Sequence, residues 1–142
     1  MDLFAKLFVA SSLFYLLAGS SLGLAMVLHP TEWRQMEYYL IAAHTHLNLL
    51  GWVSMMIYGV SYHVLPRFSG RPLYSKKLAW AHFVLAQAGL IGMSVFFFLN
   101  RLQEMAWKKE LALSGALTWI SICLFVFNLL KTLVSPQNQE RS

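Results

Sequence analysis

The stretch YYLIAAHTHLNLLGWVSMMIYGVSYHVL, residues 38–65, decides the fold. It contains no lysine, arginine, aspartate or glutamate. A helix of roughly 20 apolar residues crosses the hydrocarbon core of a bilayer, and this stretch is longer than that. Because lipid offers no partner for backbone N–H and C=O groups, a helix is the expected conformation. The stretch therefore predicts a membrane-spanning helix.

The rest of the chain has the same character. Of its 142 residues, 58% are hydrophobic and only 12% are charged, with a mean hydropathy of +0.54. A soluble domain carries about a quarter charged residues. Pro66 and Pro72 are expected to break the chain after the second span. We predict an all-α membrane protein with a single four-helix domain over residues 1–142, with helices at about 7–28, 38–65, 78–99 and 111–130.

The net charge of +5 is explained by membrane topology, so we expect membrane lipid and no nucleic acid as a partner. The one cysteine, Cys123, excludes an internal disulfide. The first span is too long for the apolar core of a signal peptide and is expected to be retained. We expect an inner (cytoplasmic) membrane protein of a bacterium or archaeon, and the positive-inside rule predicts that both termini are cytoplasmic. The expected inner side carries Lys6, Arg67, Arg71, Lys76, Lys77, Lys131 and Arg141, against Arg34, Arg101, Lys108 and Lys109 outside.

Within the second span, His44 and His46 are functional candidates, since ionisable groups inside a bilayer are costly. Residues two apart on a helix point roughly 200° apart, so the two imidazoles are expected on opposite faces, each at its own site. Gly51 returns to the face of His44 and would leave room for something flat, and Asn48 adds a polar group nearby. Metal or heme ligation and hydrogen bonding between helices both fit this pattern.

Other residues support weaker predictions. His63 and His82 flank the loop after the second span and could hold copper or zinc together, although histidines at helix ends are more often interfacial. Arg67 and Arg71 are expected to contact lipid phosphate. Arg34 is a weaker candidate for a heme propionate. The sequence GSSLG, residues 19–23, predicts close helix packing.

The segment AHTHLNLLGWVSMMIYGVSYHVLPRF, residues 43–68, resembles the catalytic subunit of heme-copper oxidases and nitric oxide reductases. It is similar to the tenth helix of that subunit and also to the second helix of nitric oxide reductase. The resemblance implies that His46 is a ligand of the low-spin heme, and one of the two alignments implies that His44 is a ligand of the high-spin heme. The family subunit has about twelve helices in three arcs of four. The four spans here resemble one such arc, and the chain lacks the vicinal histidine pair of the binuclear centre.

We therefore predict a b-type cytochrome that binds protoheme (heme b) iron through His46, with His44 as a further ligand. We expect electron transfer, or sensing of NO or O2, with a redox partner protein as a candidate. Since closed symmetry is usual for identical chains, we further hypothesise a homo-oligomer (dimer or trimer) that shares heme between neighbouring copies of His46. At most the chain is part of an oxidoreductase. The alternatives are a non-catalytic assembly or accessory subunit with structural histidines, and a copper- or zinc-handling protein that uses His63 and His82.

Overall fold

The structure is a computed structural model that describes residues 1–28, 37–102 and 106–134. The positions of Arg34 and Arg141, and the side chain of Arg101, lie outside this description. The described elements are α1 (Leu3–Leu28), α3 (Glu37–His46), the π-helix η2 (Leu47–Ser54), α4 (Met55–Phe68), α5 (Lys76–Leu102) and α6 (Lys108–Val134). Since α3, η2 and α4 follow one another without a break, they form one continuous span.

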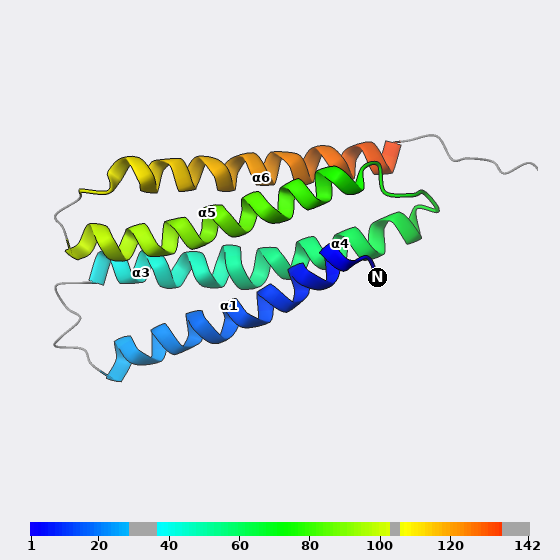
Figure 1. Cartoon of the computed structure of the whole chain (residues 1–142). Helices are drawn as coiled ribbons and strands as arrows, with labels where there is room; N and C mark the ends of the chain where they lie inside the picture. The colour runs from blue at the N-terminus through cyan, green and yellow to red at the C-terminus, as the bar shows by residue number, and fades with distance from the viewer. Residues whose placement is uncertain (29–36, 103–105, 135–142) are drawn as a thin grey trace, which may run out of the picture.

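Among the described residues, four helices are long and apolar enough to cross a membrane. They are Leu3–Leu28, Tyr38–Phe68, Lys76–Asn100 and Lys108–Val134. This confirms the prediction of an all-α membrane protein with four spans. The spans lie side by side along a common direction, with the α3–α4 span and α5 in the middle (Figure 1). The N-terminus lies at the end of the bundle where α4 finishes and α5 starts (Figure 1).

Most helix ends extend a few residues beyond the predicted spans, because the prediction stopped at the first charged, amide or proline residue and the helices continue past it. The expectation that Pro66 breaks the second span is wrong, since Pro66 lies inside α4 and the helix continues to Phe68. The break comes at Gly70, which has φ of 63° and follows the C-cap residue Ser69. In this position the N–H of Arg71 donates to the Pro66 carbonyl at 3.0 Å, and the N–H of Gly70 to the Arg67 carbonyl at 3.2 Å. These two bonds form a Schellman motif.

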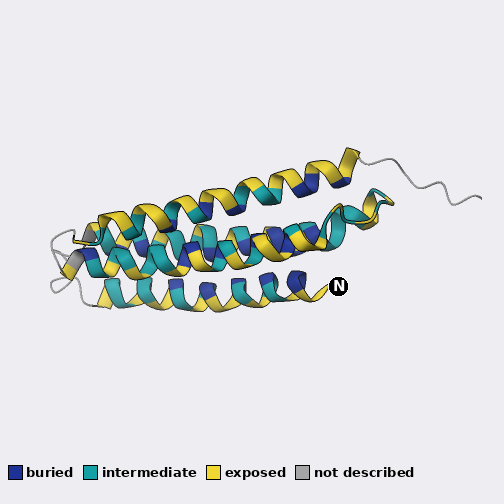
Figure 2. Ribbon diagram, turned by 45° about the horizontal axis from the view of Figure 1, so that its top comes forward, coloured by how far each residue is buried: buried dark blue, intermediate teal, exposed yellow. Residues whose placement is uncertain are grey.

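Small residues bring the helices together, and large apolar residues face outward. On α6, Ser114 and Thr118 are buried against α5, where Gly89 and Gly92 leave space for them. Small residues at helix interfaces are typical of membrane proteins, because lipid supplies little hydrophobic drive for association. The buried residues form narrow inward stripes, while the outer surface of the bundle is exposed (Figure 2). That apolar outer surface is suited to contact with lipid chains.

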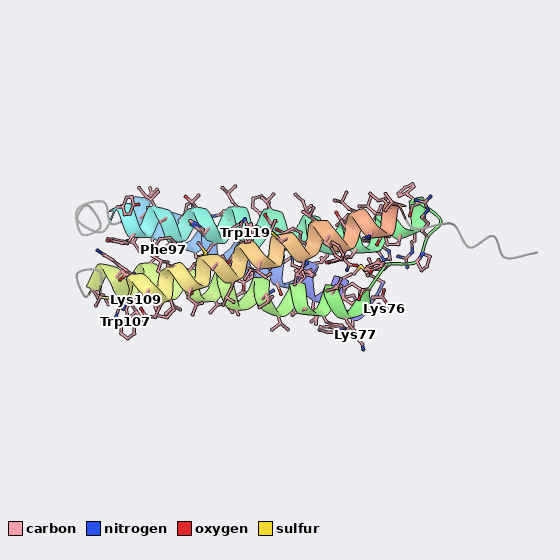
Figure 3. All side chains as sticks on the ribbon, turned by 90° about the horizontal axis from the view of Figure 1, so that it is seen from above. Lys76, Lys77, Phe97, Trp107, Lys109 and Trp119 are labelled. Atoms are coloured by element: carbon pink, nitrogen blue, oxygen red, sulfur yellow. The ribbon has the colours of Figure 1, made fainter. Side chains whose placement is uncertain are left out.

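Charged residues are concentrated at the ends of the bundle. Lys76 and Lys77 lie at the end where α5 begins, and Lys109 lies at the opposite end with Trp107 (Figure 3). At the first end the turn before α5 is held by α6. Asn128 accepts from the Ser75 N–H at 3.0 Å and donates to its carbonyl at 2.9 Å. The α4–α5 connection is therefore fixed to the body of the bundle.

Candidate functional site

His44 faces α1. Its Nδ1 lies 2.9 Å from the Gly19 carbonyl oxygen. Since a carbonyl only accepts, Nδ1 carries the proton, and in the neutral imidazole Nε2 then keeps a lone pair. The ring fits against Gly23, where a Cβ would lie 2.7 Å from Cε1 of His44. The glycines of the GSSLG motif thus admit polar side chains of the second span, which confirms the predicted close packing.

His46 faces the other way. It is the last residue of α3, and its ring lies 5.1 Å from the ring of Phe97 on α5. This confirms that the two histidines of the H-x-H sequence lie on opposite faces of the span. The Nδ1 of His46 donates to the Ala42 carbonyl of its own helix at 2.7 Å. Its Nε2 is therefore free to bind a metal, because an imidazole ligand usually donates its other N–H to a carbonyl or carboxylate.

A small pocket of about 220 Å³ lies beside His46. It is lined by Thr45, His46, Leu49 and Leu50, of which Thr45 and Leu49 are exposed on the outer surface. Pockets that enclose a drug-sized ligand measure roughly 300–1,000 Å³. The pocket can therefore receive one edge of a large flat molecule without enclosing it. The rest of such a molecule would need cover from lipid or from another protein chain.

Asn48 lies at the contact between the second span and α1, four residues after His44. Its Nδ2 donates to the His44 carbonyl at 2.9 Å and sits against Gly19, where a Cβ would come within 2.6 Å. Asn48 thus supports the backbone of the H-x-H segment and fills the contact with α1. Its place beside His44 agrees with the sequence-based expectation of a polar group at this level.

The eight-residue π-helix η2 follows directly after His46, and sequence reasoning missed it. A π segment widens the helix and is frequent at functional sites. The Ser54 hydroxyl, bonded to the Leu49 carbonyl at 2.8 Å, spans the five residues of one π turn. No residue type marks such a segment, so the composition of residues 47–54 gave no signal. The π turn shifts the register between the histidines and the rest of the span.

Gly51 was expected to leave room for a flat cofactor. In the structure it is buried, and the space beside it holds Tyr15 of α1: a Cβ on Gly51 would lie 2.7 Å from the Tyr15 Cβ and Cγ. Leu90 of α5 is also close, at 3.1 Å. The Tyr15 hydroxyl in turn donates to the side-chain oxygen of Gln87. Gly51 thus admits a tyrosine from the same chain.

His63 and His82 have different surroundings. The Nδ1 of His63 accepts from Arg67 at 2.7 Å, one turn away on α4. His82 is fully buried, with its Nδ1 bonded to the Tyr62 hydroxyl at 3.0 Å. An interfacial position is therefore wrong for His82. The reason is an aromatic cage contributed by three other helices, whose rings surround it: Phe8, Tyr58, Tyr62 and Phe125.

Within the described residues no group of three or more His, Cys, Asp or Glu side chains could hold a metal ion. Each of the two histidines at the H-x-H segment offers a single imidazole. A heme needs only axial ligands from the protein, because its porphyrin supplies the other nitrogens. The donor set therefore fits a heme iron better than a bare metal ion.

Comparison with known proteins identifies the family of the chain. Residues 3–127 match the family described as Cytochrome C and Quinol oxidase polypeptide I. The chain belongs to this family. It is 32% identical over 90 residues to cytochrome c oxidase subunit 1 of Rhodobacter capsulatus. It is 29% identical over 92 residues both to a cytochrome c oxidase subunit 1 homolog of Agrobacterium tumefaciens (strain T37) and to the cbb3-type cytochrome c oxidase subunit CcoN1 of Stutzerimonas stutzeri.

These alignments cover 63% or 64% of this chain but only 16% to 18% of the relatives. The chain thus spans about a sixth of the length of the curated relatives it matches. Membership in the family establishes an oxidase subunit I-like integral membrane protein. The cofactor and activity of the chain itself are argued below.

Proposed function

We propose that this protein is a b-type membrane cytochrome in which the Nε2 of His46 binds the iron of protoheme. One observation carries the proposal. The Nδ1 of His46 donates to the Ala42 carbonyl at 2.7 Å, which in the neutral imidazole leaves the lone pair of Nε2 beside a pocket at the outer surface. The family match, whose relatives are named as cytochrome c oxidase subunits, supports a heme as the group that occupies it.

The residues around His46 have separate tasks in this proposal. The Ala42 carbonyl fixes the tautomer and the rotation of the imidazole. The ring of Phe97 packs against the imidazole at 5.1 Å and limits its movement. Leu49 and Leu50 give the pocket an apolar wall that keeps water from the metal. Bound heme would supply a one-electron redox centre or a binding site for a gas such as NO or O2.

A homo-oligomer would complete the site. The pocket is too small to enclose a heme, and it opens between the exposed residues Thr45 and Leu49. A second copy of the chain, in a dimer or trimer, would bring its own His46 to the other face of the heme. Closed symmetry is the usual arrangement of identical chains. Ligation by two histidines gives a low-spin heme suited to electron transfer with a redox partner protein.

His44 is a further ligand candidate because its Nε2 is also unprotonated. The same hydrogen bond favours a second function, that of an accessory or assembly subunit with structural histidines. In that case the bond from His44 to the Gly19 carbonyl serves only to join α1 to the second span. The accessory protein would fold without heme and would be colourless.

We further propose that the protein lies in the inner membrane of a bacterium or archaeon with both termini in the cytoplasm. The N-terminus and the start of α5, which carries Lys76 and Lys77, lie at the same end of the bundle (Figures 1 and 3). Positively charged loops favour the cytoplasmic side.

The test is the absorption spectrum of the protein purified in mild detergent from a heme-sufficient host. The unmodified protein is expected to show a sharp reduced α-band. His46→Ala should abolish it, while the matched control His63→Ala should keep it, because His63 bonds to Arg67 away from the pocket. Retained heme in His46→Ala refutes the ligand assignment, and a colourless, folded wild type favours the accessory subunit. A heme-free monomer would refute the shared site.

A further inference from the structure

A second pocket lies at the other end of the second span, at the α4–α5 connection. Its volume is about 500 Å³, larger than that of the pocket beside His46. Arg67 is about 30 Å along the span from His46, given a rise of 1.5 Å per residue. This pocket therefore lies near the opposite membrane surface from the proposed heme and is independent of it. Its lining residues are Asp2, Tyr62, Pro66, Arg67, Gly70, Arg71, Pro72, Leu73 and Lys76.

The backbone of the connection positions Arg71 in this pocket. Gly70 adopts φ of 63°, a left-handed conformation that a residue with a Cβ adopts only at a cost. The chain then turns back so that the N–H of Arg71 donates to the Pro66 carbonyl at 3.0 Å. The Nε of Arg71 is buried and has no hydrogen-bond partner among the described residues. A buried donor without a partner is costly, so an acceptor from outside the chain is expected there.

The charges in the pocket favour an anion. Arg67, Arg71 and Lys76 contribute three cations, and among the described residues Asp2 is the one acidic side chain that lines the pocket. Asp2 pairs with Lys76 at 3.1 Å, but the two side chains are 46% and 68% exposed. An ion pair this exposed contributes little and can exchange for another partner. Arg67 also donates to the His63 ring at 2.7 Å, which holds its guanidinium beside the pocket.

The shape of the site indicates which anion. An arginine fork matches the oxygens of a phosphate, and the pocket lies where two spans meet the membrane surface. Pro66, Pro72 and Leu73 give it an apolar part, which a free inorganic ion would not need. We propose that this pocket binds the phosphodiester headgroup of an anionic phospholipid, with Arg71 as the main contact and Lys76 beside it.

The site also offers a path for a lipid tail. A third pocket, of about 330 Å³, is lined by His63, Val64, Arg67 and Phe68. Arg67 lines both pockets, so the third pocket adjoins the basic pocket beside α4. An acyl chain that leaves the headgroup in this direction would lie against Val64 and Phe68, whose side chains face the lipid.

Native mass spectrometry of the full chain in mild detergent tests the proposal, with added phosphatidylglycerol and phosphatidylcholine. The protein is expected to retain phosphatidylglycerol preferentially. Arg71→Gln should lower that retention about five-fold, the effect of one basic residue near an anionic surface. The matched pair Lys76→Gln and Lys77→Gln removes the same charge from adjacent positions (Figure 3). Only Lys76 lines the pocket, so only its substitution should weaken retention.

Three results would overturn the proposal. The first is equal retention of the two lipids. The second is equal loss in Lys76→Gln and Lys77→Gln, which would indicate general surface charge. The third is displacement of phosphatidylglycerol by millimolar inorganic phosphate, which would make the site one for a free anion. Since Lys76 is exposed, Lys76→Gln is expected to fold. It therefore tests the site even if Arg71→Gln fails to fold. None of these outcomes depends on heme.

Discussion

Substitution of Gly89 by alanine should separate α5 from α6. A Cβ at this position would overlap Oγ1 of Thr118 and would lie 2.8 Å from the Thr118 nitrogen and 2.9 Å from the Ser114 carbonyl oxygen. Two of these atoms belong to the backbone of α6, so a change of side-chain rotamer cannot relieve the contact. Ordinary carbon contacts lie at about 3.5–4.0 Å. The two helices must therefore move apart by roughly 0.5–1 Å along their interface.

The expected cost follows from two opposing effects. Overpacking of a close interface destabilises by about 1–3 kcal/mol. Alanine favours a helix interior over glycine by about 1 kcal/mol, which offsets part of that loss. Gly115 on α6 is the matched control, since a Cβ there meets nothing within 4 Å. Gly115→Ala should be neutral or stabilise by up to about 1 kcal/mol. The free energies of unfolding of the two variants should thus differ by about 2 kcal/mol.

The assay is reversible unfolding in mixed detergent micelles, followed by circular dichroism, with both variants and the unmodified chain in parallel. The helix propensity term is common to the two substitutions, so the difference between them isolates the contact with α6. Equal stability of Gly89→Ala and Gly115→Ala would refute the close approach of α5 and α6 at this position. Greater destabilisation by Gly115→Ala would do so as well.

Three further substitutions test other parts of the bundle by the same unfolding assay. Gly70→Ala should destabilise by about 1–2 kcal/mol, because alanine is strained at φ of 63°; no loss would contradict the left-handed turn. Tyr62→Phe should cost about 1–3 kcal/mol by leaving the buried Nδ1 of His82 unpaired; a neutral result would show that the bond is absent. Asn128→Ala should expose the α4–α5 connection to protease, since it removes both bonds to Ser75; unchanged cleavage would contradict that clamp.

The sequence predicted the spans well because lipid imposes a single strong requirement. Long charge-free stretches must be helical in a bilayer, and the four predicted spans are all present, with ends within a few residues. The opposite directions of His44 and His46 also followed from helical periodicity alone. Close helix packing at the GSSLG glycines also followed from residue size, whereas their partners on the second span, Asn48 and His44, came only from the structure. Each of the predicted features depends only on local sequence.

The sequence failed where the outcome depends on distant residues. The burial of His82 depends on rings from α1, α4 and α6, and nothing near residue 82 indicates them. The space beside Gly51 is taken by Tyr15, which is far away in the sequence. The π-helix after His46 arises from packing and has no signature in composition. In physical terms, the local sequence pattern predicts which face of a helix a residue lies on, whereas the residues that contact it there depend on tertiary packing.

The two hydrogen bonds of the H-x-H sequence make the structural and ligand roles separable. The bond of His44 crosses to the Gly19 carbonyl on α1, whereas the bond of His46 returns to the Ala42 carbonyl of its own helix. Interhelical bonds of this kind contribute about 0.6 kcal/mol on average, and His44→Ala also leaves a gap beside Gly23. In heme-free protein, His44→Ala should therefore lower the free energy of unfolding more than His46→Ala.

Heme content should show the reverse order if His46 is the ligand. His46→Ala would lose the heme with little loss of stability, because the hydrogen bond of His46 lies within its own helix and joins no two helices. Both quantities can be measured on the same two variants, by unfolding in micelles and by absorption. If the same substitution caused the larger loss of both stability and heme, the proposed division would be refuted. Helix packing and iron ligation would then not be assigned to opposite faces of the second span.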